Sequence, residues 1–235
     1  MIIKTIATGS TGNCYLIDDG CTQLLLECGI IFKKIQQALN YQTSKVAACL
    51  ISHSHQDHCK GVQGALNASM DVYMSKATTD EVGIEHNRIK QYTNKQQFKI
   101  GSFTILPFDV KHDVENHGFL IQSDNGSKLL FATDTYYVRY KFAGLTHLMI
   151  ETNYSEAILD ENIERGTIHP FLAKRIKASH FSLENVLEFL KANDLSKVEE
   201  IHLLHLSNSN SDEENFKRAV QEQTGKLVLC HKKGD

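Results

Sequence analysis

The sequence predicts an α/β protein with two β-sheets packed face to face and helices on the outside. Two observations lead to this fold class. Strand-like runs alternate with helical periodicity along the chain, and a coarse order of strands followed by helices occurs once in each half. The composition is that of an ordinary globular protein, with 41% hydrophobic and 23% charged residues. No linker is apparent, so we expect residues 1–235 to form a single domain.

Strands are expected where aliphatic, aromatic and β-branched runs are bounded by turn residues. The run 46–51 is apolar throughout, which is typical of a buried strand. Asp124-Asn125-Gly126 predicts a hairpin turn. The predicted strands are 2–7, 14–17, 23–27, 46–51, 71–74, 97–100, 103–108, 118–122, 128–132, 146–151, 200–206 and 226–230.

Helices are expected where apolar residues recur three or four positions apart. Phe32, Ile35 and Leu39 share one side of a helix in this way. The long segment 155–193 is interpreted as mostly helical. The predicted helices are 32–40, 60–68, 76–82, those within 155–193, and 212–223.

Charge and hydropathy exclude several classes of protein. Lysine and arginine number 25 against 28 acidic residues, a net charge of -3, so the basic face that grips a long nucleic acid is not expected. The short cluster 174–177 is interpreted as a solvated helix face. No apolar run approaches the roughly 20 residues of a membrane span, and the first residues do not resemble a signal peptide. The six cysteines form no CxxC pair, which favours free thiols in the cytoplasm.

The strongest chemical signal is His53-Ser-His55-Gln-Asp57-His58, which directly follows the buried strand 46–51. His53 and His55 are two residues apart and point the same way from an extended segment. Asp57 and His58 lie where the chain turns into a helix, so their side chains can face a second metal position. Imidazole and carboxylate together suit zinc, and also iron or manganese. The segment therefore predicts ligands for two neighbouring metal ions.

This HxHxDH pattern resembles the metallo-β-lactamase superfamily, and the resemblance covers essentially the whole chain. It implies an αββα four-layer sandwich with the metals in a cleft at one sheet edge. It also implies further ligands at strand ends, for which the chain offers His112, Asp134 and His205. In the dinuclear pattern of the family, His53, His55 and His112 hold one metal and Asp57, His58 and His205 the other, while Asp134 and a hydroxide bridge them. Two Zn²⁺ ions per chain are expected, with Mn²⁺ as an alternative.

Other histidines compete with these ligands. His117 lies five residues from His112 and opens the next strand, so we interpret it as a residue at the rim of the cleft, near substrate. His202 lies three residues from His205 and points to the opposite face of the same strand. His205 is preferred because Leu-Ser-Asn follows it, as in relatives. The remaining histidines have no metal context and are expected in ordinary surface or core positions; they are His86, His147, His169 and His231.

Ser179-His180-Phe181-Ser182 is similar to a stretch of the YycJ-like and RNase Z-like branches, in which the histidine lies beside the metals and helps the leaving group. The resemblance thus implies that His180 and the ligand Asp57 take part in catalysis; an incidental histidine near a helix start is the alternative. A helix starting at Ser182 would leave His180 on a loop. The turn 9–14 resembles the GSxGN turn of the same branch. Glu27 stands where relatives have aspartate, and it is expected either to orient a ligand histidine or to be purely structural.

The resemblance is strongest to the anti-Pycsar proteins, which hydrolyse 3′,5′-cyclic nucleotides to 5′-monophosphates. It implies a dinuclear zinc phosphodiesterase that acts on substrates such as cyclic CMP and cyclic UMP and counters antiphage signalling, in the host cytoplasm if the gene is carried by a phage. It also implies a homodimer, with helices between 155 and 193 as the expected interface. One alternative is a YycJ-like exonuclease acting on single-stranded nucleic acid. Thioester or lactone hydrolysis fits the metals but not His180. A non-catalytic protein that sequesters a nucleotide is a further alternative.

Overall fold

The computed structural model describes residues 1–231, which fall into two compact units. Unit 1 contains residues 1–109 and 114–127, and unit 2 contains residues 110–113 and 128–231. The strands belong to two sheets. Among the described residues, no helix is both long enough and apolar enough to cross a membrane.

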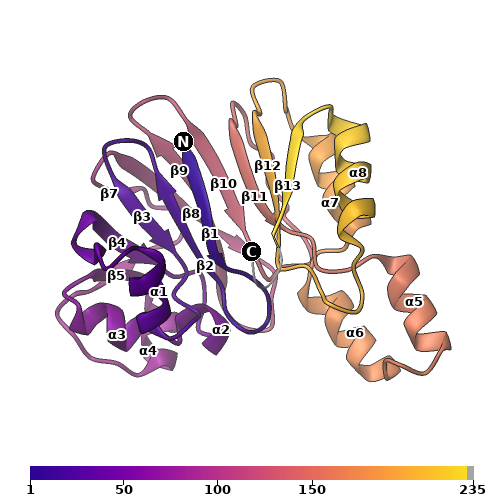
Figure 1. Cartoon of the computed structure of the whole chain (residues 1–235), viewed down its shortest axis with the longest axis horizontal. Helices are drawn as coiled ribbons and strands as arrows, with labels where there is room; N and C mark the ends of the chain where they lie inside the picture. Colours follow the sequence, from indigo (N-terminus) through magenta and orange to yellow (C-terminus); the bar gives the residue numbers. More distant parts are fainter. Residues whose placement is uncertain (232–235) are drawn as a thin grey trace. The chain divides into compact units, whose positions relative to one another are not determined.

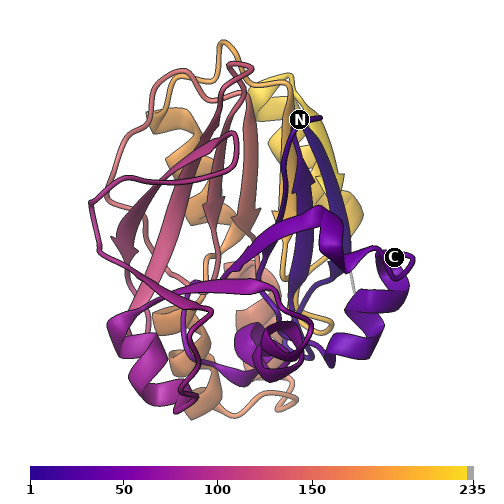
Figure 2. The same cartoon turned by 90° about the vertical axis from the view of Figure 1, so that its left-hand side faces the viewer.

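Unit 1 is built on a sheet with the strand order β1-β2-β3-β4-β5-β6. The first three strands are antiparallel, and Figure 2 shows β1 and β2 in indigo running side by side. From β3 to β6 the strands are parallel, so the carboxyl ends of β3, β4 and β5 lie at the same sheet edge. The strands are β1 (Ile2–Ala7), β2 (Cys14–Asp18), β3 (Gln23–Leu26), β4 (Val46–Leu50), β5 (Asp71–Ser75) and β6 (Ile89–Tyr92).

Helices of unit 1 gather beside β4 and β5 (Figure 1). Phe32 and Ile35 from one helix and Val62 and Leu66 from another share a buried core with residues of β3, β4 and β5, which fixes the helices against the sheet. The helical segments are α1 (Phe32–Ala38), the 3-10 turn Thr43–Lys45, α2 (Gln56–Cys59), α3 (Val62–Asn67) and α4 (Lys76–Val82).

Three further strands of unit 1 lie in the order β9-β8-β7 and belong to the second sheet: β7 (Phe98–Ile100), β8 (Phe103–Val110) and β9 (Asn116–Ser123). Phe98 stacks on Tyr73 and on Tyr92, with ring centroids 5.3 and 5.9 Å apart. The carboxylate of Asp19, in the β2–β3 turn, accepts hydrogen bonds from the hydroxyls of Ser102 and Ser123. Burial opposes ionisation of Asp19, but these bonds and two from backbone N–H groups lower its pKa to about 2.

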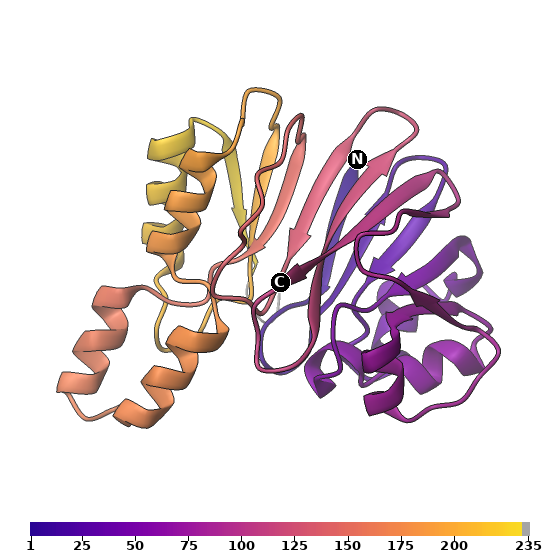
Figure 3. The same cartoon turned by 180° about the vertical axis from the view of Figure 1, so that it is seen from behind.

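Unit 2 contains a parallel sheet with the order β10-β11-β12-β13. Its helices form two side-by-side pairs, α5 with α6 and α7 with α8, and Figure 3 shows both pairs from behind. Helix α8 lies along β13, and Phe216 and Val220 of that helix are fully buried. The elements are β10 (Lys128–Ala132), β11 (His147–Glu151), α5 (Glu156–Glu164), α6 (Pro170–Ser179), α7 (Leu183–Ala192), β12 (Glu200–Leu204), α8 (Glu213–Thr224) and β13 (Leu227–Cys230).

The predicted α/β class with two sheets and helices is confirmed. The segment 155–193 divides into three helices, and the expected helix at 60–68 begins at Val62 after the separate short helix α2. Strand β6 was not predicted, because Ile89-Lys-Gln-Tyr92 has apolar residues only at its ends. That residues 1–235 form a single domain stays a prediction, and residues 232–235 lie outside the described part of the chain.

Candidate metal centre

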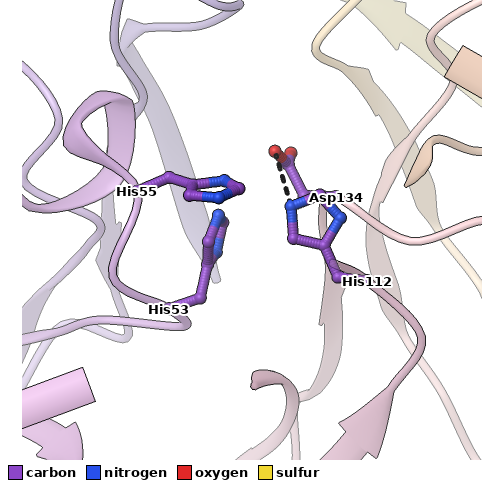
Figure 4. A group of neighbouring side chains, drawn as sticks. All are labelled: His53, His55, His112 and Asp134. Carbon is purple, nitrogen blue, oxygen red and sulfur yellow. Dashed lines mark ion pairs between the residues drawn. The ribbon is translucent and has the colours of Figure 1, made fainter. Parts of the chain in front are cut away.

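The first group of donors lies in unit 1, in the segment that follows β4. The strand ends at Leu50, and His55 immediately precedes α2. The ring centroid of His53 lies 4.8 Å from that of His55 and 4.1 Å from that of His58. Asp57 Oδ2 lies 3.5 Å from His58 Nε2. Figure 4 shows His53 and His55 next to each other in this segment. One stretch of chain therefore gathers imidazoles and a carboxylate.

Two other loops of unit 1 hold this segment. The backbone N–H of Asn13 donates to Asp57 O at 2.7 Å, and its side-chain amide nitrogen lies 3.1 Å from His58 Nε2. The carboxylate of Glu27 is fully buried, accepts the N–H of Ser52 at 3.3 Å, and has Oε2 3.5 Å from His58 Nδ1. Glu27 has a φ of 65°, which residues other than glycine rarely adopt. These contacts are of the kind that fix the orientation of a ligand histidine.

The second group of donors lies in unit 2. Asp134 follows β10, is 3% exposed and has a φ of 49°. Thr133 Oγ1 donates to Asp134 Oδ1 at 2.9 Å. His112 Nε2 lies 3.9 Å from Asp134 Oδ2, the ion pair drawn as a dashed line in Figure 4, and 3.1 Å from Asp113 Oδ1. His112 Nδ1 lies 3.2 Å from Ser179 O, so the ring is held on both sides.

Glu151 is the centre of the second group. It is the last residue of β11 and is fully buried. Its Oε1 lies 2.6 Å from His180 Nδ1 and 3.3 Å from His205 Nδ1. Its Oε2 accepts the backbone N–H groups of Thr135 at 3.0 Å and Phe181 at 3.4 Å. A buried carboxylate with these partners is satisfied by hydrogen bonds and orients both imidazoles.

His205 completes this group. It follows β12 by one residue, has a φ of 54°, and its Nδ1 lies 2.8 Å from Asp134 Oδ1. Carboxylates at Nδ1 favour the tautomer in which Nε2 carries the lone pair that a metal takes. Asp134, Glu151, His180 and His205 each offer a ligand atom within 4.8 Å of one another. This His/Asp/Glu cluster is able to bind a metal ion.

The competing histidines have other partners. His117 is buried, with its ring edge-on to Tyr92, and burial lowers the pKa of His117 despite nearby acidic residues. His202 lies within β12, where its Nδ1 contacts His231 Nε2 at 2.9 Å and its Nε2 contacts Glu200 at 3.1 Å. The other three lie close to structural partners: His86 accepts the N–H of Arg88, His169 accepts the N–H of Phe171, and His147 Nδ1 contacts Thr146 Oγ1.

No motif in the sequence singles out Glu151. The available signal was a carboxylate in the last position of a fully buried strand, followed closely by Thr152-Asn153. An unpaired charge is rarely tolerated there, so such a residue indicates a buried partner. The identity of that partner, His180, could not be inferred because the two residues lie 29 positions apart in sequence.

Comparison with known proteins identifies the family. Residues 22–205 match the family model described as "Beta-lactamase superfamily domain". The chain belongs to the beta-lactamase superfamily. The match covers both donor groups described above and confirms the resemblance seen in the sequence. The chain is thus a member of a superfamily of metal-dependent hydrolases, with a His/Asp cluster able to bind metal ions.

Relatives of this superfamily member include named exonucleases. The chain is 28% identical over 229 residues to exodeoxyribonuclease WalJ of Streptococcus pneumoniae, and this alignment covers 89% of this chain and 82% of that protein. It is 27% identical over 243 residues to exodeoxyribonuclease YycJ of Bacillus anthracis, which covers 93% and 87%. Among solved structures, the metallo-beta-lactamase fold protein YhfI of Bacillus subtilis matches with a TM-score of 0.76, 18% identity and coverage of 99% and 97%. The last match shows the fold alone.

Proposed function

We propose that the protein is a metal-dependent phosphodiesterase that removes nucleotides from single-stranded DNA. The observation that carries this proposal is the similarity to WalJ and YycJ, two exodeoxyribonucleases matched over about nine-tenths of this chain. The Glu151–His180 pair beside Asp134 and His205 supports it, because phosphodiester cleavage needs a group that supplies a proton to the leaving oxygen.

We propose that two metal ions, Zn²⁺ or alternatively Mn²⁺, are held by the seven residues expected from the sequence: His53, His55, Asp57, His58, His112, Asp134 and His205. The donor chemistry fits, since buried imidazoles and carboxylates are the ligands these ions take. When bound, a metal pair supplies Lewis acidity at the scissile phosphate and an activated water. Glu27 lies within 3.5 Å of His58 Nδ1, where it would orient that ligand.

The other catalytic roles fall to residues of this chain. Glu151 holds the Nδ1 side of His180, so the Nε2 side faces away from the carboxylate. His180 is partly exposed, with 22% of its side chain accessible, whereas Glu151 is not exposed. The contact with Glu151 fixes the orientation of the ring, which suits Nε2 of His180 to donate a proton to the departing oxygen. Asp57 would act in catalysis as a metal ligand.

A second candidate substrate is a 3′,5′-cyclic nucleotide such as cyclic CMP or cyclic UMP, hydrolysed to the 5′-monophosphate to counter antiphage signalling. The observation that favours it is the net charge of -3, since binding a long nucleic acid draws on many phosphate contacts. An exonuclease that grips only the end of a strand needs fewer such contacts, so the charge does not exclude the first candidate.

The first prediction compares these candidates directly. Metal analysis of the purified protein should give about two ions per chain. The protein is then incubated with 5′-phosphorylated single-stranded DNA, single-stranded RNA and a panel of 3′,5′-cyclic nucleotides. We expect release of mononucleotides from DNA that stops on chelation, and no release by the matched His53→Ala variant. Turnover of cyclic nucleotides alone would favour the second candidate. Binding of nucleotides without turnover of any substrate would favour sequestration and reject both enzymes.

We further propose a homodimer formed through helices between residues 155 and 193, working in the cytoplasm. Helix α6 supports an interface there, because its first turn exposes 75% of Phe171 and 47% of Leu172. Sedimentation should give a dimer for the unaltered protein and a weaker dimer for Phe171→Asp. A fully active monomer at working concentration would reject this proposal.

A further inference from the structure

Two exposed tyrosines directly follow the candidate ligand Asp134. Tyr136 is 38% exposed and Tyr137 is 54% exposed, although their neighbours Thr135 and Val138 are buried. Large aromatic rings are usually covered, so two adjacent exposed rings between buried residues indicate a contact surface.

The backbone that carries these tyrosines is fixed by Thr135. The Thr135 hydroxyl donates to Tyr137 O at 3.0 Å and accepts the N–H groups of Tyr137 at 3.2 Å and Lys111 at 3.0 Å. The N–H of Thr135 donates to Glu151 Oε2 at 3.0 Å. Through Thr135, the backbone of the tyrosines is therefore hydrogen-bonded both to the carboxylate that orients His180 and to the loop that carries His112.

The chain keeps the backbone of these tyrosines close to Asp134. Tyr136 is two residues along the chain, so the two Cα atoms are at most about 7 Å apart. The segment continues with Arg139 and Lys141, both exposed, and the guanidinium carbon of Arg139 lies 5.0 Å from the ring centroid of Tyr140. Exposed aromatic rings interspersed with cations are the features that bind single-stranded nucleic acid, since bases stack on the rings and cations attract the phosphates.

We propose that Tyr136 and Tyr137 form a stacking platform for the nucleobase next to the phosphodiester that is cleaved. This inference rests on the proposed function, and it narrows the substrate class to phosphodiesters that carry a base. Stacking uses the face of the base and not its hydrogen-bonding edge, so the platform accepts every base with similar affinity. The tyrosines are thus residues of substrate recognition, separate from the proton-donating pair.

The test compares a single-stranded DNA with the same strand in which the terminal nucleotides are abasic. For the unaltered protein, KM should be about 5- to 100-fold lower for the strand with bases, the usual worth of one stacked base. Tyr136→Ala/Tyr137→Ala should lose this difference with little change in kcat, because stacking binds substrate and transition state alike. Tyr136→Phe/Tyr137→Phe should keep it. Tyr41→Ala, which removes a ring that is 67% exposed in unit 1, is the matched control and should behave as the unaltered protein.

A binding measurement separates failure of this inference from failure of the proposed function. Inactive His53→Ala protein is titrated with 3′-labelled strands, with and without terminal bases, and anisotropy is recorded. If the unaltered protein cleaves no phosphodiester, the proposed function fails. The platform is still supported if the protein prefers the strand with bases and if the double alanine variant loses this preference. Equal affinities for both strands would overturn it. A sedimentation shift to monomer with unchanged KM would also overturn it and assign the tyrosines to a subunit contact.

Discussion

At the residue scale, the Glu151–His180 contact adds an oriented imidazole to what would otherwise be a cluster of metal donors. Glu151 is fully buried and bonds His180 at 2.6 Å, while its second oxygen is occupied by backbone N–H groups. A carboxylate in this arrangement cannot turn away to water, so it holds one imidazole edge permanently. Because the contact with His180 is the shorter of its two imidazole contacts, the effect of Glu151 on proton transfer is expected to pass through His180, and its contact with His205 affects metal binding instead.

The second prediction tests this dependence. His180→Ala should lower kcat by about 10²- to 10⁴-fold on natural phosphodiesters, the usual worth of a general acid. Glu151→Gln should lower it less. In protein of equal metal content, the double variant should be no worse than His180→Ala, because Glu151 acts on proton transfer through His180. A nitrophenyl phosphodiester, whose leaving group needs no proton, should be affected much less. Equal losses on both substrates, with metal content unchanged, would show that His180 only positions the substrate.

At the element scale, two loops of unit 1 are packed backbone to backbone against the HxHxDH segment. Gly29 N–H donates to Asn13 O at 2.8 Å, Asn13 N–H donates to Asp57 O at 2.7 Å, and Cys28 N–H donates to His58 O at 2.8 Å. A Cβ at Gly29 would lie 1.6 Å from Asp57 O, so only glycine allows this approach. The close packing sets the positions of Asp57 and His58 more tightly than helix α2 alone would.

The third prediction concerns this glycine. Gly29→Ala should displace the backbone at Asp57, destabilise the protein by about 1–3 kcal/mol or more and weaken metal binding. Gly83→Ala is the matched control: nothing lies within 4 Å of its Cβ, and its φ of 68° should cost only the strain of a left-handed residue, about 1–2 kcal/mol. Urea unfolding and metal titration measure both effects. Intact metal affinity in a folded Gly29→Ala protein would contradict the packing argument.

At the scale of the whole molecule, buried histidines occur in both units. His117 in unit 1 and His202 in unit 2 are 3% and 1% exposed. Burial lowers the pKa of each, and acidic neighbours, Glu115 and Glu200 respectively, only partly oppose that effect. Since both rings are neutral in the fold and titrate near 6.5 when unfolded, the unfolded chain takes up more protons as the pH falls.

The fourth prediction follows from this extra proton uptake by the unfolded chain. The stability of the chelated protein should fall as the pH is lowered from about 7.5 through 6.5 and level off below the folded pKa values. His202→Gln should flatten this slope by at most about 1.4 kcal/mol per pH unit. His86→Gln, at an exposed position, should leave the slope unchanged. Urea unfolding at several pH values measures the slope, and a His202→Gln slope equal to that of the unaltered protein would contradict the argument.

The sequence by itself determined most of the strands and helices, though not β6 or the helix boundaries within 155–193, and it determined where the first donors lie. The all-apolar run before His53 could form only a buried strand, and a helix at 76–82 follows from Ser75, whose hydroxyl accepts the N–H of Thr78, and from Gly83 after its end. Ser182 likewise begins α7 and leaves His180 outside the helix, as predicted. These features are local, because periodicity and capping depend on residues only a few positions apart.

Only the tertiary structure decided which distant side chains meet. The residues after His205 favour it over His202 in the sequence, but its partner comes from the fold. Strand β12 ends at Leu204, so His202 stays in the sheet beside His231 while His205 turns to Asp134. Glu151 carried no motif and acquires its partners from the parallel register of β11 with β12 and from the loop before α7. Register and strand order are set by burial summed over whole sheets, and no local pattern encodes that sum.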